Sequence, residues 1–544
     1  MTTAPLRVAA AVAAAALLAV NAAPTAVAMG PPVINPAALP PDGPPGPDEE
    51  MRQSSACAAP VVVGDPDVMQ PPPGNMMLDI TSAWRYSTGN GVTVAVIDSG
   101  VTPTPRLPRL FAGGDYVMGE ADGGLADCEG HGTVVASIIG ASPADPAARP
   151  APRPADIPEP GPPPPVQPNR ILPPPPPPPV THTVIVSPPA PTTIIQQLPP
   201  PPPPVSAPPE TPPAWGDPDG TQPLIGAPGG PDGIVGVAPD ATLISIRQSS
   251  TAFSPAHPDP ADVAAHRKAG DILTLARAIR HAADLGVDVI NVSLASCINA
   301  AAPVDMDPLG AAVRYAAVER DVVIVAAAGN RGEQQDCGQN DAFNPLNTAD
   351  PRDWAGVRTV VAPALFSDYV LTVGAVTPGG VPMPDSINGP WVGVAAPGTR
   401  IVGLSNVDGA AVNAMPDQAP GLGDPLWGTS FSAAYVAGVA ALVRGKYPDL
   451  SAAQIIRRIT ATAHNPPRRV DNQVGYGIVD PVAALTFDVP AGPPLPAEHT
   501  VLRVPPPPPA PDAGPRNTAL IGVAALIGVM AVGAGIGRIR RNWT

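Results

Sequence analysis

Proline sets the strongest limit on what this chain can fold into. Of its 544 residues 86 are proline, and 34 of these lie between residues 143 and 223, including an unbroken run at 173–179. Proline has a fixed φ and no backbone N–H, so such a segment can neither join the interior of a sheet nor continue a helix. We therefore predict that residues 142–223 form a disordered or polyproline II insert, with the folded part of the chain on either side.

Two interpretations of this insert stay open. Residues 180–186 and 192–197 are short β-prone stretches between the prolines, compatible with a small hairpin. The insert is either a surface insertion that the fold tolerates or an arm that docks other proteins, because extended proline-rich segments suit recognition. The residues favour neither.

Apolar runs alternate with helical patterns on both sides of the insert. Strands are expected at 92–97, within 233–246, and at 287–294, 322–328, 370–376 and 392–404, and helices at 80–86, 272–285, 310–320, 432–446 and 452–463. Continuous apolar strands separated by helices indicate a mainly parallel sheet between two layers of helices, an α/β fold. Ligand sites in such sheets lie at the carboxyl ends of the strands.

The N-terminus has the pattern of an export signal. Arg7 is the only charged side chain before the apolar run 8–20, and the small residues Ala26 and Ala28 follow it. The apolar run is too short to span a bilayer, so a cleaved signal peptide at 1–28 is favoured over an uncleaved anchor.

A second apolar segment lies near the C-terminus. Residues 518–537 carry no charge over the length that a membrane helix needs, and the tail 538–544 begins with an arginine. Positive charge favours the cytoplasmic side of a membrane. We therefore predict one transmembrane helix at 518–537, with the bulk of the chain outside the cytoplasm.

These segments divide the chain. The predicted order is signal peptide 1–28, a Pro-rich extension 29–75, a catalytic domain 76–487 interrupted by the insert 142–223, a Pro-rich linker 488–517, the membrane helix 518–537 and a cytoplasmic tail 538–544. The extension is too short and too rich in proline to fold alone, so we expect it to stay attached and wrap the domain.

Charge and cysteine content narrow the possible partners. The net charge is −16 and no basic cluster precedes the extreme C-terminus, so nucleic acid is not an expected partner. Four cysteines in an exported chain predict two disulfides, for which three pairings are possible. The absence of a Cys-x-x-Cys motif argues against a metal or redox site at these residues.

Three reactive side chains stand at ends of predicted elements. Asp98 ends the strand in "VTVAVIDSG", His131 begins a helix in "HGTVVASIIGA", and Ser430 begins a helix in "GTSFSAAYVAG". Taken singly, each is ordinary in a turn or at a helix cap. Together they can supply a nucleophile, its base and an orienting acid, because strand ends and helix starts converge on one side of a parallel sheet.

In this order and with these neighbours, the motifs closely resemble those of the subtilisin-like serine proteases. That family carries Asp-Ser/Thr-Gly, His-Gly-Thr and Gly-Thr-Ser motifs in the same order, and the resemblance covers residues 75–485 without the insert. It implies a subtilisin-like fold and a serine endopeptidase that needs no cofactor. Asp98 would orient His131, His131 would be the general base and then the general acid, and Ser430 the nucleophile.

The resemblance extends to further site residues. Asn330 ends the buried strand in "VVIVAAAGN", where the family places a donor for the oxyanion, with the Ser430 backbone N–H as the second donor. "NVSLAS" resembles the edge segment that pairs with an extended substrate, which assigns substrate binding to Ser293, Leu294 and Ala295.

Two features bear on how far the family pattern applies. Ala434 stands four residues after the serine, where the family usually has proline; this leaves the triad unchanged and affects only local helix geometry, since Ala is a much better helix former. Calcium sites are common in the wider family, but no Asp/Asn cluster with a calcium-loop pattern is present, so no metal is expected.

A narrower resemblance is to the mycosins, the membrane-anchored subtilases of mycobacterial type VII secretion. It rests on the export signal, the Pro-rich extension with "SSACAAP", the motif "DCEGHGTVVAS" and the C-terminal anchor. It implies a protease in the inner membrane, with its catalytic domain on the periplasmic side, a protein or peptide as substrate and a type VII secretion complex as partner. The alternative is a mainly structural subunit that stabilises this complex, with catalysis secondary.

The cysteine pairing can then be predicted. Cys297 and Cys337 each follow a buried strand and should lie in loops at the same edge of the sheet, so we pair them. Cys57 is left for Cys128, which lies three residues before His131. The second bridge would tie the extension beside the active site, an arrangement that resembles the mycosins.

Overall fold

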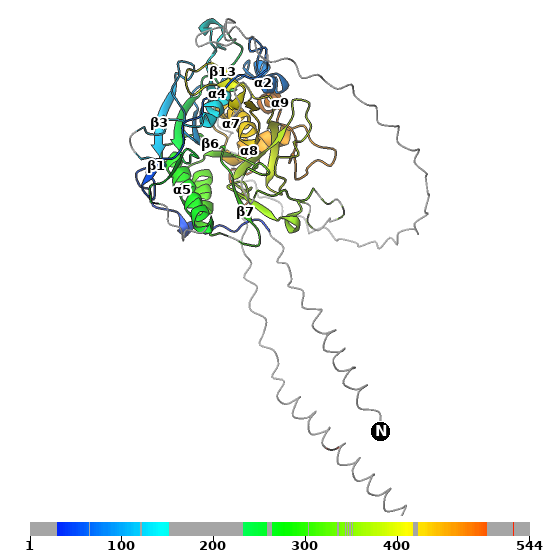
Figure 1. Cartoon of the computed structure of the whole chain (residues 1–544). Coiled ribbons are helices and arrows are strands. Elements are labelled where there is room, and N and C mark those ends of the chain that lie inside the picture. Colours follow the sequence, from blue (N-terminus) through cyan, green and yellow to red (C-terminus); the bar gives the residue numbers. More distant parts are fainter. Residues whose placement is uncertain are drawn as a thin grey trace, which may run out of the picture. The chain divides into compact units, whose positions relative to one another are not determined.

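The computed structural model of the chain is shown in Figure 1. It describes residues 30–151, 232–497 and Leu526, with short gaps at 65, 120–121, 258–263, 303, 334–336, 343, 345, 347–349, 351 and 417–422, and only the backbone of 264–270. The predicted signal peptide, most of the insert and of the linker, the tail and, apart from Leu526, the predicted membrane helix lie outside the described residues. No helix within them is both long and apolar enough to cross a bilayer. Met1–Glu498 forms one compact unit and His499–Thr544 a second, and the fold below belongs to the first.

A seven-stranded sheet is the centre of this unit, in the order β11-β10-β8-β6-β2-β4-β3. Every neighbouring pair is parallel. The strands are β2 (Thr93–Asp98), β3 (Leu110–Asp115), β4 (Thr242–Arg247), β6 (Val289–Val292), β8 (Val323–Ala327), β10 (Val370–Val376) and β11 (Val392–Pro397). The predicted parallel sheet is therefore confirmed.

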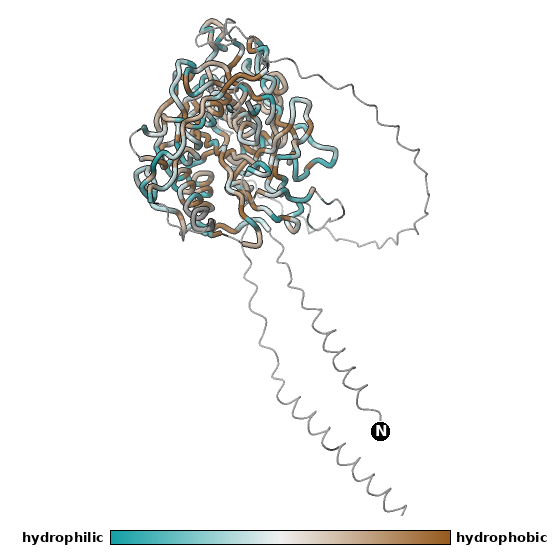
Figure 2. The backbone as a smooth tube through the Cα atoms, in the orientation of Figure 1, coloured by the Kyte–Doolittle hydropathy of each residue, from teal (hydrophilic) through white to brown (hydrophobic). Residues whose placement is uncertain are grey.

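Both faces of the sheet are buried. Along β2, Val94 and Val96 belong to one apolar core while Ala95 and Ile97 belong to the other, as the two-residue period of a strand requires. The first core is completed by α4 (His131–Gly140), α7 (Thr429–Lys446), α8 (Ala452–Thr462) and α9 (Pro481–Thr486), and the second by α5 (Ala264–Asp284) and α6 (Asp307–Arg314). Figure 2 shows the apolar segments inside and hydrophilic ones along the outer loops.

Several predicted element boundaries were wrong. The helix expected at 310–320 begins earlier, because Pro308 suits a first helical turn, and it changes at Tyr315–Glu319 into a π-helical turn. The strand expected at 392–404 ends at Pro397, and Gly403–Leu404 (β12) pairs in a separate sheet with β13 (Ala411–Val412). The strand expected at 287–294 is shortened to β6.

Three further two-stranded sheets and two short helices surround the core. The sheets pair β1 (Met51–Gln53) with β5 (Phe253–Pro255), β7 (Ser296–Asn299) with β9 (Thr359–Ala362), and β14 (Ala414–Pro416) with β15 (Gly423–Pro425). The helices are α2 (Pro73–Met77) and α3 (Ile80–Ala83), the second shorter than the predicted helix at 80–86.

The N-terminal extension lies against the domain along much of its length. Its strand β1 pairs with β5, Val61 bridges to Ala414, and Asp48 forms an ion pair with Arg277 at 2.6 Å. Close to its predicted end at residue 75 the chain enters α2, which begins at Pro73. Proline suits the first position of a helix.

Two disulfides fix loops around the sheet. Cys57 of the extension is bonded to Cys128, and Cys297 of β7 is bonded to Cys337 in the loop after β8. The two pairs are those expected from the sequence. The first bridge brings the extension to the residues that precede α4.

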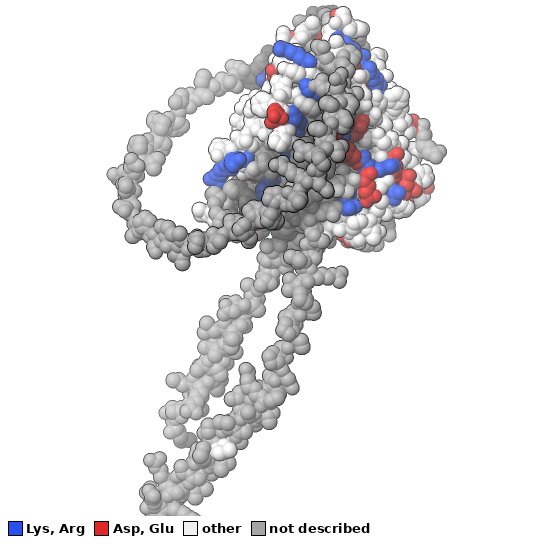
Figure 3. All heavy atoms as spheres, turned by 180° about the vertical axis from the view of Figure 1, so that it is seen from behind, with Lys and Arg blue, Asp and Glu red and all other residues white. Residues whose placement is uncertain are grey.

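Charged residues of opposite sign lie together on part of the surface. On the face turned away in Figure 1, basic and acidic residues lie side by side over one region and the remaining basic ones are scattered (Figure 3). Ion pairs such as Arg314–Glu319 at 2.9 Å and Arg320–Asp284 at 2.6 Å have this character. Exposed pairs of this kind contribute little to stability, at most about 1 kcal/mol each.

Candidate active site

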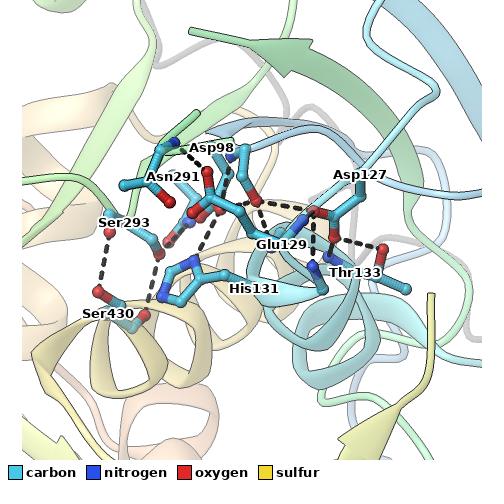
Figure 4. Close-up of polar contacts among 12 residues, drawn as sticks. Asp98, Asp127, Glu129, His131, Thr133, Asn291, Ser293 and Ser430 are labelled. Atoms are coloured by element: carbon cyan, nitrogen blue, oxygen red, sulfur yellow. Dashed lines mark hydrogen bonds and ion pairs between the residues drawn. The ribbon is translucent and has the colours of Figure 1, made fainter. Parts of the chain in front are cut away.

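The end of β2 and the start of α4 bring Asp98 and His131 together. Asp98 is fully buried at the carboxyl end of β2. His131 Nδ1 lies 2.7 Å from Asp98 Oδ1, which also accepts the Ser99 N–H at 2.7 Å. A carboxylate can only accept, so Nδ1 carries a proton, and Nε2 can act as a base when the ring is neutral. Figure 4 shows the imidazole ring between Asp98 and Ser430.

A glycine allows this close approach. A Cβ atom at Gly132 would lie 2.0 Å from the Gly100 carbonyl oxygen and 3.0 Å from Asp98 Oδ1. The residue after the histidine therefore has to lack a side chain if α4 is to begin against the end of β2.

Asp127 fixes the loop before α4 and the first turn of this helix by hydrogen bonds. Its carboxylate accepts the backbone N–H groups of Glu129, Gly130 and Thr133 and the Thr133 hydroxyl, at 2.7 to 3.0 Å. Ser99 Oγ lies 3.0 Å from Asp127 Oδ1 and 3.2 Å from Asp98 Oδ1. Burial raises the pKa of the Asp127 carboxyl against the effect of these donors. Sequence reasoning missed this residue, although it begins the motif "DCEGHGT".

The electrostatics favour a protonated histidine. Burial alone would lower the pKa of His131, but the charge and hydrogen bond of Asp98, with smaller contributions from Asp127 and Glu333, raise it to about 9. An imidazolium formed during catalysis is therefore stabilised at this position.

Ser430 is the second residue of α7 and faces the end of β6. Its Oγ donates to the Ser293 carbonyl oxygen at 2.8 Å, and Ser293 Oγ donates to the Ser430 carbonyl oxygen at 2.9 Å. Phe431, the next residue, places its ring 5.2 Å from the His131 ring, centroid to centroid. Among the described contacts Ser430 makes no hydrogen bond to His131, so its hydroxyl is beside the base but turned to Ser293.

The start of α7 also orients Asn330. The Thr429 N–H and hydroxyl donate to Asn330 Oδ1 at 2.9 and 3.1 Å, and the Thr429 hydroxyl accepts the Gly329 N–H at 3.1 Å. With its oxygen held in this way, Asn330 turns its Nδ2 outward, where it donates to Glu333 Oε2 at 3.0 Å. Neither Thr429 nor Glu333 was predicted, because nothing in their sequence spacing shows this contact.

A cleft of about 460 Å³ runs past these groups. Asp98 and His131 line it on one side, and Ser293, Leu294 and Ala295 on another. A larger cavity of about 620 Å³, between the N-terminal extension and the loops near residues 400 and 425, is lined by none of these residues. Ser430 and Asn330 are not among the residues that line the cleft, but they hydrogen-bond to Ser293 and Glu333, which are.

Comparisons with known proteins show the family of this chain. Residues 217–477 match the subtilase family. Mycosin-2 of Mycobacterium tuberculosis is 52% identical over 98% of this chain and 98% of its own length. The chain belongs to the mycosin family of subtilases.

Solved mycosin structures share the fold. A crystal structure of MycP1 from Mycobacterium smegmatis is 40% identical, with a TM-score of 0.68 over 88% of this chain and 100% of that one. A mycosin chain in the periplasmic assembly of the ESX-5 inner membrane complex is 46% identical, with a TM-score of 0.67 over the same shares. This mycosin is accordingly a subtilisin-like serine protease.

The mycosin departs from the usual subtilase pattern at Ala434 without interrupting α7. The helix runs from Thr429 to Lys446, and Ala434 is fully buried within it. In the described ranges no group of three His, Cys, Asp or Glu side chains is arranged to hold a metal ion.

Proposed function

We propose that this mycosin is an endopeptidase whose catalytic residues are Asp98, His131 and Ser430. The observation that carries the proposal is the 2.7 Å hydrogen bond between Asp98 and His131, beside the amino end of the helix that holds Ser430. A serine hydroxyl is a weak nucleophile until a base accepts its proton, and this arrangement supplies an oriented base.

In the proposed reaction the Ser430 hydroxyl rotates from the Ser293 carbonyl toward His131 Nε2. His131 accepts its proton as Ser430 Oγ attacks the substrate carbonyl carbon, and Asp98 stabilises the resulting imidazolium. His131 then gives the proton to the leaving amine, which breaks the peptide bond and leaves an acyl-enzyme. Water, activated by His131, hydrolyses the acyl-enzyme and restores Ser430.

Two donors are assigned to the oxyanion. Asn330 Nδ2 and the Ser430 backbone N–H would stabilise the negative charge that develops on the substrate oxygen. Thr429 supports this role by fixing the Asn330 side chain. The substrate would run as an extended strand beside Ser293, Leu294 and Ala295, which line the cleft.

The proposed setting is a type VII secretion complex in the inner membrane. It is supported by the likeness to mycosin chains in the ESX-5 inner membrane complex and by the predicted signal peptide and membrane helix. We propose a single anchor at 518–537 and a catalytic domain on the periplasmic side.

The endopeptidase proposal is tested with the purified full-length chain and a library of internally quenched peptides. Cleavage that disappears in Ser430→Ala supports it. Equal cleavage by Ser430→Ala and by the parent chain would assign the activity to another group.

A second function, structural support of the secretion complex, is favoured by one observation. A mycosin chain that covers 93% of this one has been solved inside an intact ESX-5 inner membrane complex. The test compares the amount of assembled complex in cells with Ser430→Ala, with residues 143–223 deleted, and without the chain. Assembly that survives Ser430→Ala but not loss of the chain supports a scaffold role, and equal loss in both ties assembly to catalysis.

A further inference from the structure

Glu333 sits where it can control the oxyanion donor. We propose that Glu333 makes this protease selective for peptides with a Lys or Arg side chain near the scissile bond, because that cation draws the Glu333 carboxylate away from Asn330. The inference rests on the proposed function, since it assigns a substrate class to the same site.

The first step is the contact itself. Glu333 Oε2 accepts a hydrogen bond from Asn330 Nδ2 at 3.0 Å, and Asn330 Oδ1 is held from the other side by Thr429. The amide therefore cannot turn away to offer Nδ2 elsewhere without losing both Thr429 bonds. In this state one negative group already occupies the donor that the oxyanion needs.

The second step is charge. If the second N–H of Asn330 Nδ2 donates to the substrate oxygen, the Glu333 carboxylate and the oxyanion both accept from the same nitrogen. Two negative charges this close together repel each other. The oxyanion gains its full stabilisation only after the Glu333 carboxylate has moved. Glu333 is an exposed side chain, so it is free to move.

The third step identifies the group that moves the Glu333 carboxylate. Glu129, Glu333 and Asp424 line the cleft together with Asp98 and Asp271, whereas His131 is the only basic residue among the described side chains that line it. In the described part of the chain no Lys or Arg forms an ion pair with Glu333. A cation for Glu333 has to come from the substrate, and the acidic cleft attracts such a substrate.

This mechanism predicts which kinetic constant a basic substrate side chain changes. The energy of pairing a substrate Lys with Glu333 is used to free Asn330, which acts on the transition state more than on the bound substrate. A basic side chain should therefore raise kcat rather than only lower KM.

The experiment uses the purified full-length chain and an alanine-rich quenched peptide with one Lys placed at each position in turn, each compared with the Gln peptide. We expect one or two positions at which Lys raises kcat/KM about tenfold, the size of one charge-assisted hydrogen bond. In Glu333→Ala this ratio should fall to about one, while kcat on the Gln peptide rises. Glu333→Gln, which keeps the shape, should also lose the Lys preference.

The control is Glu319→Gln, which removes an equal charge from an exposed residue outside the cleft and should keep the parent ratio. A Lys preference that is unchanged in Glu333→Ala, or no preference at any position, would overturn the inference while leaving a Ser430-dependent peptidase intact. A parent chain that cleaves no peptide would instead contradict the proposed function, and the inference with it.

Discussion

The two halves of the active site differ in what their reactive atoms contact. In the base half, formed by β2 and α4, His131 Nδ1 and Asp98 Oδ1 are already 2.7 Å apart. In the nucleophile half, formed by β8 and α7, Ser430 Oγ donates to the Ser293 carbonyl and Asn330 Nδ2 to Glu333. Asp98 and His131 therefore already make the contact that the proposed reaction needs, whereas Ser430 Oγ and Asn330 Nδ2 are hydrogen-bonded to other groups of the protein.

Burial accounts for this difference. Asp98 and Asp127 are buried, and Asp98 Oδ1 and both Asp127 oxygens accept hydrogen bonds from within the fold, so the base half is held in one arrangement. The partner of Asn330, by contrast, is the exposed Glu333, and Ser430 Oγ needs only a rotation to leave Ser293. The changes that convert the resting site into the catalytic one are therefore side-chain movements in the nucleophile half.

The largest expected effect comes from removing the nucleophile. Ser430→Ala should lower kcat on the order of 10⁶-fold, a magnitude taken from subtilisin itself. Steady-state peptide cleavage measures it. Ser432→Ala is the matched control, because Ser432 lies on the same helix but donates to the Ala396 and Pro397 carbonyls. A comparable loss of kcat in Ser432→Ala would show that α7, and not the Ser430 hydroxyl, is what the reaction needs.

The next effect comes from the base half. Asp98→Asn should lower kcat by about 10⁴-fold, because an amide can donate to the imidazole and so favours the wrong tautomer. Peptide cleavage at fixed pH measures the loss. If Asp98→Asn retains activity close to that of the parent, the short contact with His131 is not part of the mechanism.

Removal of the oxyanion donor should cost less than either change. Asn330→Ala is expected to lower kcat by about 10²- to 10³-fold, the loss measured for a subtilisin oxyanion donor, with little change in KM because the donor acts on the transition state. The control Asn299→Ala changes an exposed Asn in β7. A raised KM at constant kcat in Asn330→Ala would mean that Asn330 binds the ground state instead.

A backbone change tests how tightly the base half is built. Gly132→Ala places a Cβ 2.0 Å from the Gly100 carbonyl oxygen, so it should destabilise the fold by about 1 to 3 kcal/mol. Urea unfolding of the full chain measures this. Gly43→Ala, at a position where a Cβ would meet nothing within 4 Å, should leave stability nearly unchanged. Equal stability of the two variants would mean that the backbone around Gly132 can shift to accommodate the added Cβ.

The smallest effect is a shift of the pH profile. His131 must be neutral to accept the Ser430 proton, and its pKa is raised to about 9, so kcat/KM of the parent should rise with pH and level off above about 9. Glu333 is the weakest of the acidic groups that raise this pKa. Glu333→Gln should therefore move the rise to slightly lower pH, and Asp98→Asn should move it further in the same direction. A shift to higher pH in either variant would reverse the assigned sign.

Much of the fold could be predicted from continuous apolar runs. The strand predicted at 370–376 is β10 itself, and those predicted at 92–97 and 322–328 differ from β2 and β8 by a residue or two. The edge strand β3 was missed because its side chains are half exposed and two glycines interrupt its pattern. Apolar periodicity marks buried strands well and half-exposed strands poorly.

The same division holds for the site. Asp98, His131, Asn330 and Ser430 could be proposed because each stands at an element end that a parallel sheet brings to one side. Asp127 and Glu333 could not, since their contacts depend on how the loops after β3 and β8 approach the catalytic groups. Such approaches are decided by tertiary packing, which spacing along the sequence does not reveal.

The central claim is that Ser430 is a nucleophile activated by His131 and Asp98. It is tested most directly by labelling the full-length chain with a fluorophosphonate and locating the adduct by mass spectrometry. We predict one adduct, on Ser430, that is lost in Ser430→Ala and strongly reduced in His131→Ala. An adduct on another residue, or labelling that persists unchanged in Ser430→Ala, would contradict the account.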